Sequence, residues 1–325
     1  MKKVLSILLR IVISALLLFF LFRKVDAQSM FDIVKNANKL LLVTAFLIYF
    51  LNYALCIKRW EMLIKAVNIH LPLKRIITSF SGGIFFSLFL PSTIGGDVVR
   101  SLDLAAHTKK PKEIIATVFL DRLSGYIGLV LLTLLALVFG LKIIDDKSVF
   151  LSLEIIIGIL VLALIVLFNP YAYKKINKLL KSLGANKILG MITELHEEIH
   201  IFRNKRKVIV KNICISFLIQ LITPLTYYLI SLALGLKINL LYFFVFLPII
   251  GAITLLPISI GGLGLRDATT VFFFAKVGVV KHMAFAMSLI NFSFILFYGA
   301  IGGLIYVLTV RHRRVQHHLP SGIHK

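Results

Sequence analysis

Two arginines close a sequence motif that occurs twice in this chain. Residues 91–100 read PSTIGGDVVR and residues 257–266 read PISIGGLGLR, so Pro, Ile, Gly, Gly and Arg recur in register, offset by 257 − 91 = 166. Proline removes a backbone donor and glycine admits positive φ, so each motif is expected to interrupt a helix. A helix that restarts after Gly96 or Gly264 presents free N–H groups and the positive end of its dipole, which together favour an anion.

Further charged residues accompany both arginines. Asp97 and Asp103 lie three residues either side of Arg100, and Asp267 directly follows Arg266. These carboxylates are candidates for local ion pairs on one helical face, in which case the charges are structural. A charged side chain at bilayer depth nevertheless costs roughly 2.5–3.5 kcal/mol, so several retained charges indicate a hydrated binding site.

The sequence therefore predicts one anion site, built from both motifs and from an acidic–basic pair in the apolar segment after the first motif. Arg100 and Arg266 are expected to converge on the same phosphate. The predicted site residues are Pro91, Gly95, Gly96, Asp97, Arg100, Asp121, Arg122, Pro257, Gly261, Gly262, Gly264, Arg266 and Asp267. No catalytic residue, metal or cofactor is expected, and Cys56 and Cys214 fall in apolar runs that indicate no disulfide framework.

Membrane helices are the elements that must position this site. Of the 325 residues, 59% are apolar and 16% are charged, against roughly 45–50% and 25% in soluble domains. A bilayer core of about 30 Å is crossed by about 20 apolar residues in a helix. Runs of this kind occur at 4–22, 40–57, 114–140, 151–168, 208–234 and 284–308. The first also has features of a signal peptide, and the longest polar stretch, about 40 residues, is too short for a soluble domain.

The basic residues predict how these helices are oriented. The net charge of +23 resides in short blocks between the apolar runs, which marks the cytoplasmic side of a membrane protein and argues against nucleic acid as a partner. The blocks place both termini, the loop 169–207 and a first loop in the cytoplasm of a multi-pass cell-membrane protein. The basic residues assigned to that first loop are Lys58, Arg59, Lys65, Lys74 and Arg75.

Two shorter apolar segments, 76–90 and 240–256, end at the motif prolines and reach only about 22–26 Å. Given the orientation of their neighbours, each has to return to the side from which it entered. We therefore expect two re-entrant hairpins that enter from opposite faces. The alternative is that both segments cross, with 97–113 and 268–280 as further spans and eight spans in total.

The repeat and the topology together predict an inverted repeat. Residues 1–140 form the first repeat and 151–310 the second, with 169–207 as an amphipathic cytoplasmic loop and 311–325 as a basic cytoplasmic tail. The predicted fold is thus an all-α polytopic membrane protein, a single domain over 1–325 with about six full spans and two re-entrant hairpins. Inverted repeats with broken helices that meet near the midplane indicate a transport site.

Three stretches resemble one known family. They are residues 91–100, the step Leu120-Asp121-Arg122, and residues 257–267. Over essentially the whole chain, they are similar to the flippase-type transmembrane domain of the lysylphosphatidylglycerol synthase family, also called the multiple peptide resistance factor family. The resemblance implies movement of an anionic phospholipid, or of a polyprenyl-phosphate-linked lipid, between leaflets. Full-length relatives also carry a soluble domain that transfers lysine from a charged tRNA to phosphatidylglycerol. Because this chain stops at Lys325, we expect a stand-alone member without that enzyme activity.

Two other functions are left open. The segment His196-Glu197-Glu198-Ile199-His200 matches H-E-x-x-H, which supplies two zinc ligands and a general base in a membrane metalloprotease. Glu198 puts a charge where such helices usually carry an uncharged residue, so we expect a solvated face of an amphipathic helix. The other alternative is the membrane part of an aminoacyl-phospholipid synthase with a separate catalytic partner. The partners considered are membrane lipids, a lipid-modifying enzyme or glycosyltransferase, and a second copy of the chain.

The topology is tested by labelling single cysteines with a membrane-impermeant reagent, in a background where Cys56 and Cys214 are replaced by serine. Lys110→Cys is expected to be protected in the cytoplasm, and Lys281→Cys is expected to be labelled from outside, because the two repeats face opposite ways. Labelling after permeabilisation controls for accessibility. Strong labelling at Lys110→Cys together with protection at Lys281→Cys would contradict the inverted arrangement.

Overall fold

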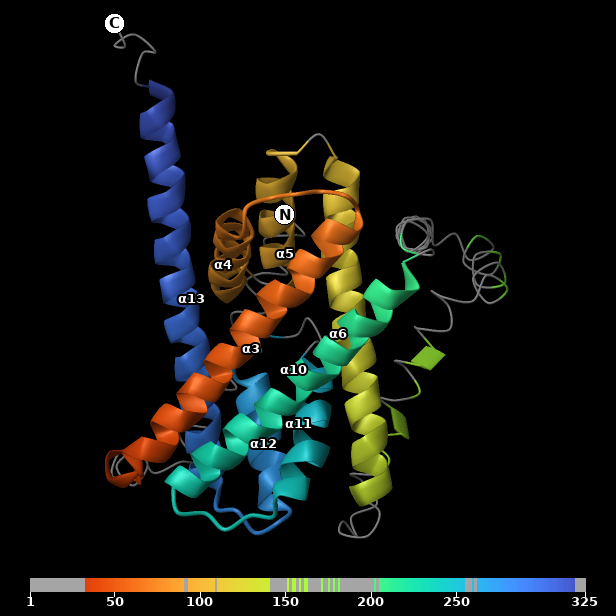
Figure 1. Cartoon of the computed structure of the whole chain (residues 1–325). Coiled ribbons are helices and arrows are strands. Elements are labelled where there is room, and N and C mark those ends of the chain that lie inside the picture. Colours follow the sequence, from red (N-terminus) through yellow and green to blue (C-terminus); the bar gives the residue numbers. More distant parts are fainter. Residues whose placement is uncertain are drawn as a thin grey trace, which may run out of the picture.

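The protein is a bundle of long and short helices (Figure 1). The computed structural model describes residues 33–90, 93–108, 110–140, 205–254 and 262–318, together with Phe202, Ser259 and isolated positions between 151 and 181. All the elements found in these residues are α-helices. They are α3 Lys39–Ala66, α4 Leu73–Phe89, α5 Thr93–Ala105, α6 Pro111–Gly140, α10 Arg206–Ala233, α11 Leu240–Thr254, α12 Leu265–Ala275 and α13 Lys281–His318.

Four of these helices, α3, α6, α10 and α13, are long and apolar enough to cross a membrane. They correspond in order to the predicted spans 40–57, 114–140, 208–234 and 284–308. The predicted span 4–22 lies outside the described residues, as does most of 151–168, where the described positions are helical. The prediction of an all-α polytopic membrane protein is therefore confirmed.

The long helices enclose the short ones. Helix α10 packs against both α3 and α6, and α13 packs against α4 and α12. Figure 1 shows α13 along one edge of the bundle and α6 along the opposite edge. Large apolar side chains on α3 and α13 remain exposed, including Leu40, Leu47, Leu304 and Leu308. Such faces suit contact with lipid tails, because the bilayer interior is itself apolar.

The short helices form two hairpins. Helix α4 packs on α5, and α11 packs on α12. With 17 and 13 residues in the first pair and 15 and 11 in the second, each helix is no longer than about 26 Å, short of a bilayer core of about 30 Å. In Figure 1, α4 and α5 lie in the half of the molecule where α13 ends, and α11 and α12 lie where α13 begins. Helices this short favour the re-entrant hairpins over the eight-span alternative, in which each would have to cross.

The glycines of the first motif do not unwind the helix, so that part of the sequence prediction was wrong. Helix α5 begins at Thr93 and contains Gly95 and Gly96, neither of which has positive φ. These glycines are needed for close packing instead. A Cβ atom on Gly83 would lie 2.9 Å from the carbonyl oxygen of Gly96, and one on Gly96 would collide with Ser87 and with the Gly83 backbone. Small residues that face each other allow two membrane helices to approach closely.

The second motif behaves as predicted where it is described. Gly262 and Gly264 have φ of +78° and +76°, and α12 begins directly after them. Asp267 accepts a hydrogen bond from the Gly264 N–H at 2.9 Å, so its carboxylate caps the new helix. Three predicted site residues of the two motifs, Pro91, Pro257 and Gly261, lie outside the described residues.

Each hairpin has its own core. Around α4 and α5, a cluster of buried side chains includes Trp60, Leu63, Ile76, Leu104 and Ile114. Around α11 and α12, a second cluster is rich in phenylalanine. It includes Phe243, Phe246, Phe273, Phe274 and Phe285. The two hairpins therefore pack in separate apolar clusters, and the second cluster also includes Ala45 of α3 and Ala136 of α6.

Replacing Gly96 tests whether close packing holds the first hairpin. Gly96→Ala is expected to destabilise the protein by about 1–3 kcal/mol or more, because the new Cβ meets backbone that has no room to move. Gly251→Ala in α11 is the matched control, since nothing lies within 4 Å of a Cβ there. Thermal unfolding in detergent measures both variants. Equal unfolding midpoints for the two would show that the hairpin has no such constraint.

Candidate anion-binding site

Arg100 is held by two carboxylates and two aromatic rings. Its Nε donates to Asp97 Oδ1 and its Nη2 donates to Asp121 Oδ2, both at 2.9 Å. The guanidinium lies 4.6 Å from the centre of the Trp60 ring and 5.2 Å from that of Phe80, so cation–π contacts add to the ion pairs. The side chain is only 5% exposed, yet Nη1 has no hydrogen-bond partner among the described residues. One donor of this buried cation thus remains for a ligand.

Asp121 joins Arg100 to Arg59, an arginine outside the predicted site. Arg59 Nε donates to Asp121 Oδ1 at 2.7 Å, and Arg59 Nη1 donates to Ser216 Oγ at 3.1 Å. Both oxygens of this carboxylate, which is 2% exposed, therefore accept a guanidinium. The sequence predicts that Arg59 lies in a cytoplasmic loop. Because α3 extends to Ala66, Arg59 is instead part of this helix and is buried inside the bundle.

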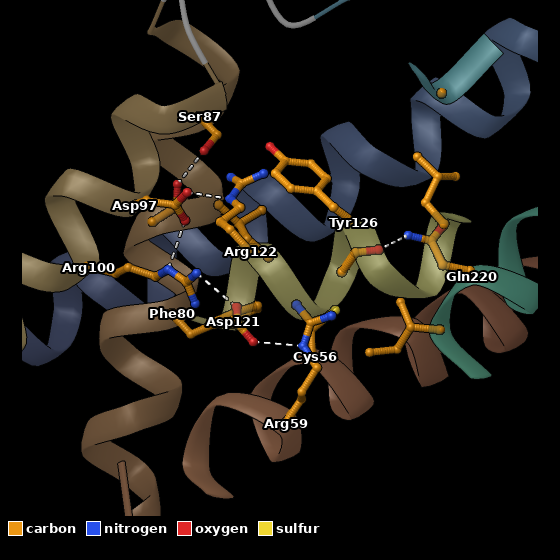
Figure 2. A pocket seen from close by; sticks show the side chains of 16 residues that line it. Cys56, Arg59, Phe80, Ser87, Asp97, Arg100, Asp121, Arg122, Tyr126 and Gln220 are labelled. Carbon is orange, nitrogen blue, oxygen red and sulfur yellow. Dashed lines mark hydrogen bonds and ion pairs between the residues drawn. The ribbon is translucent and has the colours of Figure 1, made fainter. Parts of the chain in front are cut away.

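Arg122 completes the cluster. Its Nε donates to Asp97 Oδ2, and its side chain is 33% exposed. Figure 2 shows the resulting chain, in which Arg59, Asp121, Arg100, Asp97 and Arg122 alternate in charge. Three guanidinium groups face two carboxylates, so the cluster has a net charge of +1. Bidentate guanidinium groups match the geometry of phosphate oxygens.

A cavity of about 370 Å³ lies beside this cluster, within the size range of small-ligand sites. It is lined by Cys56, Arg59, Phe80, Gly83, Ile84, Ser87, Asp97, Arg100, Asp121, Arg122, Gly125, Tyr126, Leu129, Ile219, Gln220 and Gly251. The lining comes from α3, α4, α5, α6, α10 and α11, so both halves of the chain contribute. Figure 2 shows Tyr126 next to Arg122, with Gln220 farther from the charged residues; Gln220 Nε2 donates to the Gly125 carbonyl at 3.0 Å.

The charged residues of the cluster lie several residues inside their helices, away from the helix ends. Arg59 is seven residues before the end of α3, Arg100 is five before the end of α5, and Asp121 is ten after the start of α6. At 1.5 Å per residue, these offsets correspond to depths of roughly 8–15 Å from one end of the bundle. Charges at such a depth in a spanning helix need partners, because the loss of hydration is costly. The mutual pairing of the cluster meets that need.

The second motif forms a separate charged pair. Arg266 Nη2 donates to Asp267 Oδ1 at 2.9 Å, and Ser288 Oγ donates to the same oxygen. Arg266 also lies 4.7 Å from the centre of the Phe292 ring. It is not among the residues that line the cavity beside Arg100. In this structure the two arginines therefore do not converge on one site, contrary to the expectation from the sequence.

The position of the acidic residue in each motif explains this difference. Asp97 precedes the first arginine by three residues and accepts hydrogen bonds from both Arg100 and Arg122, so it links Arg100 to α6. Leu263 occupies the equivalent place in the second motif, and Asp267 instead caps its own helix. Asp103, which the sequence also offered as a partner of Arg100, accepts from Arg75 on α4 at 3.1 Å. Arg75 had been assigned to a cytoplasmic loop and is buried.

The segment from His196 to His200 lies outside the described residues. Within the residues that are described, no group of three or more His, Cys, Asp or Glu side chains is arranged to hold a metal ion. Of the two cysteines, Cys56 lines the cavity and Cys214 is exposed on α10.

Comparison with known proteins identifies the family. Residues 7–303 match the model of the lysylphosphatidylglycerol synthase TM region. The chain belongs to this family. A UPF0104 membrane protein of Pyrococcus horikoshii is 24% identical over 312 residues, which cover 90% of this chain and 92% of that protein. A UPF0104 membrane protein of Methanothermobacter thermautotrophicus is 25% identical over 284 residues, with 80% and 82% covered. The resemblance seen in the sequence is confirmed, and the protein is a multi-pass membrane protein.

Removing the shared carboxylate tests how the cluster is held. Asp121→Ala is expected to lower the free energy of unfolding by about 3–5 kcal/mol, because Arg59 and Arg100 both lose a buried counter-ion. Adding Arg59→Ala should recover part of that loss, since one stranded charge is removed. Arg122→Ala is the control, with a loss below about 1 kcal/mol at its more exposed position. An Asp121→Ala protein that unfolds in detergent at the wild-type temperature would contradict the arrangement.

Proposed function

We propose that this protein moves a lipid with an anionic phosphate head group between the two leaflets of the membrane. The observation that carries the proposal is the buried cluster of three arginines and two aspartates beside a cavity inside the helix bundle. Membership of the family of the lysylphosphatidylglycerol synthase TM region supports a role that involves membrane lipids.

The charge of the cluster favours a phosphodiester. With three guanidinium groups and two carboxylates, the cluster carries +1, so one phosphodiester of charge −1 would neutralise it. Arg100 Nη1 is a buried donor without a partner among the described residues, and the side chain of Arg122 is a third exposed. A phosphate that accepts from these groups replaces the water that an uncompensated buried charge would need.

Only the head group needs the cavity. The lipid tails remain in the bilayer, against the exposed apolar faces of the long helices. The sequence does not distinguish a glycerophospholipid from a polyprenyl-phosphate-linked lipid, because both present a phosphate at the end of an apolar chain. The proposal is therefore defined by the phosphate head group.

An inverted repeat supplies a route across the membrane. We propose that 1–140 and 151–310 are the two repeats, with both termini in the cytoplasm, and that their hairpins rock against each other. In the described conformation the Arg100 cluster lines the cavity, while Arg266 is held by Asp267 and Ser288. Exposure of Arg266 in the opposite conformation would give the phosphate a second binding position.

Transport is measured in proteoliposomes with fluorescent phosphatidylglycerol, from the fraction of label that a membrane-impermeant reductant reaches. Wild-type protein is expected to equilibrate this lipid faster than fluorescent phosphatidylcholine, whose head group carries no net charge. Arg100→Ala should slow phosphatidylglycerol transport by about tenfold or more, since one charged hydrogen bond contributes about 1.5–3 kcal/mol. Arg100→Lys should recover part of the rate, because ammonium does not reproduce the guanidinium fork.

The folded state of Arg100→Ala is expected to survive, because Asp121 retains Arg59 and Asp97 retains Arg122. Arg266→Ala should also slow transport, while Arg206→Ala, at the exposed start of α10, is the control of unchanged rate. Protein amount in the vesicles is determined alongside each rate. Wild-type transport by a well-inserted Arg100→Ala protein would rule out the arginine site.

A further inference from the structure

A second charged cluster lies outside the cavity, where α5 ends. Arg75 of α4 donates from Nη2 to Asp103 Oδ1 at 3.1 Å and to the Asp103 carbonyl oxygen at 3.2 Å. The same nitrogen lies 2.6 Å from Nδ1 of His107. The side chains of Arg75 and Asp103 are 7% and 11% exposed. A nearly buried arginine and carboxylate therefore meet an exposed imidazole at the end of α5.

Asp103 differs from the other buried aspartates in its hydrogen bonds. Both carboxylate oxygens accept a donor in Asp97, in Asp121 and in Asp267. Asp103 Oδ2 has no partner among the described residues, and neither have Nε and Nη1 of Arg75. A buried carboxylate oxygen without a donor carries a desolvation penalty, which a proton on that oxygen removes. Of these four carboxylates, Asp103 is the one that its surroundings hold least firmly in the ionised form.

Asp103 is also linked to the proposed anion site. It follows Arg100 by three residues on α5, so the two side chains lie about one helical turn apart. Ser79 of α4 donates to the Arg100 carbonyl oxygen at 2.9 Å. Arg75 and Ser79, one turn apart on α4, thus hold successive turns of α5. Loss of the Arg75–Asp103 ion pair would free one of these two attachments.

Other charged or titratable groups near Asp103 come from the end of α5 and from α13. His107 is exposed, and its Nδ1 lies 2.6 Å from Arg75 Nη2 and 2.8 Å from the Asp103 carbonyl oxygen. From α13, Tyr306 interacts electrostatically with Asp103. The charged residues that α6 directs at α5, Asp121 and Arg122, pair with Arg100 and Asp97 instead.

We propose that Asp103 is a proton-binding site that couples lipid movement to a proton gradient; this rests on the proposed function. A proton from water binds Asp103 Oδ2, the ion pair with Arg75 breaks, and α5 shifts along α4 with Arg100. In the shifted conformation the proton leaves to water on the other side; the hairpin then returns, and the ion pair re-forms. Each cycle then moves one proton together with one lipid head group.

Infrared difference spectroscopy tests the proton site without reference to transport. Difference spectra of the reconstituted protein between acidic and neutral pH are expected to contain the protonated carboxyl bands of all titrating groups, with one component in the wild type that is absent in Asp103→Asn. Asp103→Asn keeps an oxygen that accepts from Arg75, so the hairpin is expected to remain folded. Glu113→Gln, in the first turn of α6, is the matched control and should retain the band. Identical spectra for the wild type and Asp103→Asn would overturn the site.

Transport under an imposed pH gradient tests the coupling. With one proton bound per cycle, the wild-type rate should change by up to about tenfold per pH unit while the site is unsaturated. Asp103→Asn should still exchange phosphatidylglycerol, but at a rate that the gradient does not alter, and Glu113→Gln should respond like the wild type. A wild-type rate independent of the gradient, or a response that persists in Asp103→Asn, would overturn the coupling.

The two measurements separate this proposal from the proposed function. If no variant moves lipid under any condition, the proposed function fails, and the coupling fails with it, while the infrared band still reports whether Asp103 binds a proton. If Asp103→Asn does not fold, Asp103→Glu takes its place in the infrared measurement, since a glutamate still binds a proton and would keep a response to the gradient. That change should shift the carboxyl band, because the group moves by one methylene, and an unshifted band would assign it to another residue.

Discussion

The contact on which the site depends is the carboxylate of Asp121 between Arg59 and Arg100. It is 2% exposed, and each of its oxygens accepts a guanidinium from a different helix. Three helices, α3, α5 and α6, are thereby joined at one buried point, and Ser216 adds α10 through Arg59. A lone charge at this depth would be expelled or neutralised, so the arginines and aspartates of the site stabilise one another's burial. The same ion pairs thus hold the helices together and give the anion site its shape.

The two copies of the motif show how one sequence element serves two structural roles. In the first copy, glycines lie within α5 and let it approach α4 closely, which brings Arg100 onto Trp60 and Phe80. In the second copy, glycines with positive φ start α12, and Asp267 caps that start. The arginine of the first copy consequently lines a cavity, whereas that of the second is held by its neighbour. This asymmetry suits a protein that presents one site at a time.

The aspartates described above differ in how many of their carboxylate oxygens accept a hydrogen bond. Those at the cavity have donors on both oxygens, which fixes the shape and charge of the site. Asp103, about one turn after Arg100 on α5, lacks a donor on one carboxylate oxygen. A fully paired carboxylate holds a structure in place, whereas a partly paired one responds to the proton concentration. Helix α5 carries one of each kind, Asp97 and Asp103, within two turns.

The sequence by itself determined the membrane helices, the two hairpins and the repeated arginine motif. Long apolar runs specify spanning helices, since backbone hydrogen bonds in a helix are local and lipid excludes the alternatives. The motif likewise identified Asp97 and Arg100 as candidate site residues, and the charged pair in the next apolar segment identified Asp121 and Arg122. Only the tertiary structure decided that Arg59 and Arg75 are buried partners rather than loop charges, and that Arg266 stands apart from Arg100. Arg59 meets Asp121 across 62 positions and Ser216 across 157, and no local pattern encodes such pairs, because they arise from how whole helices pack.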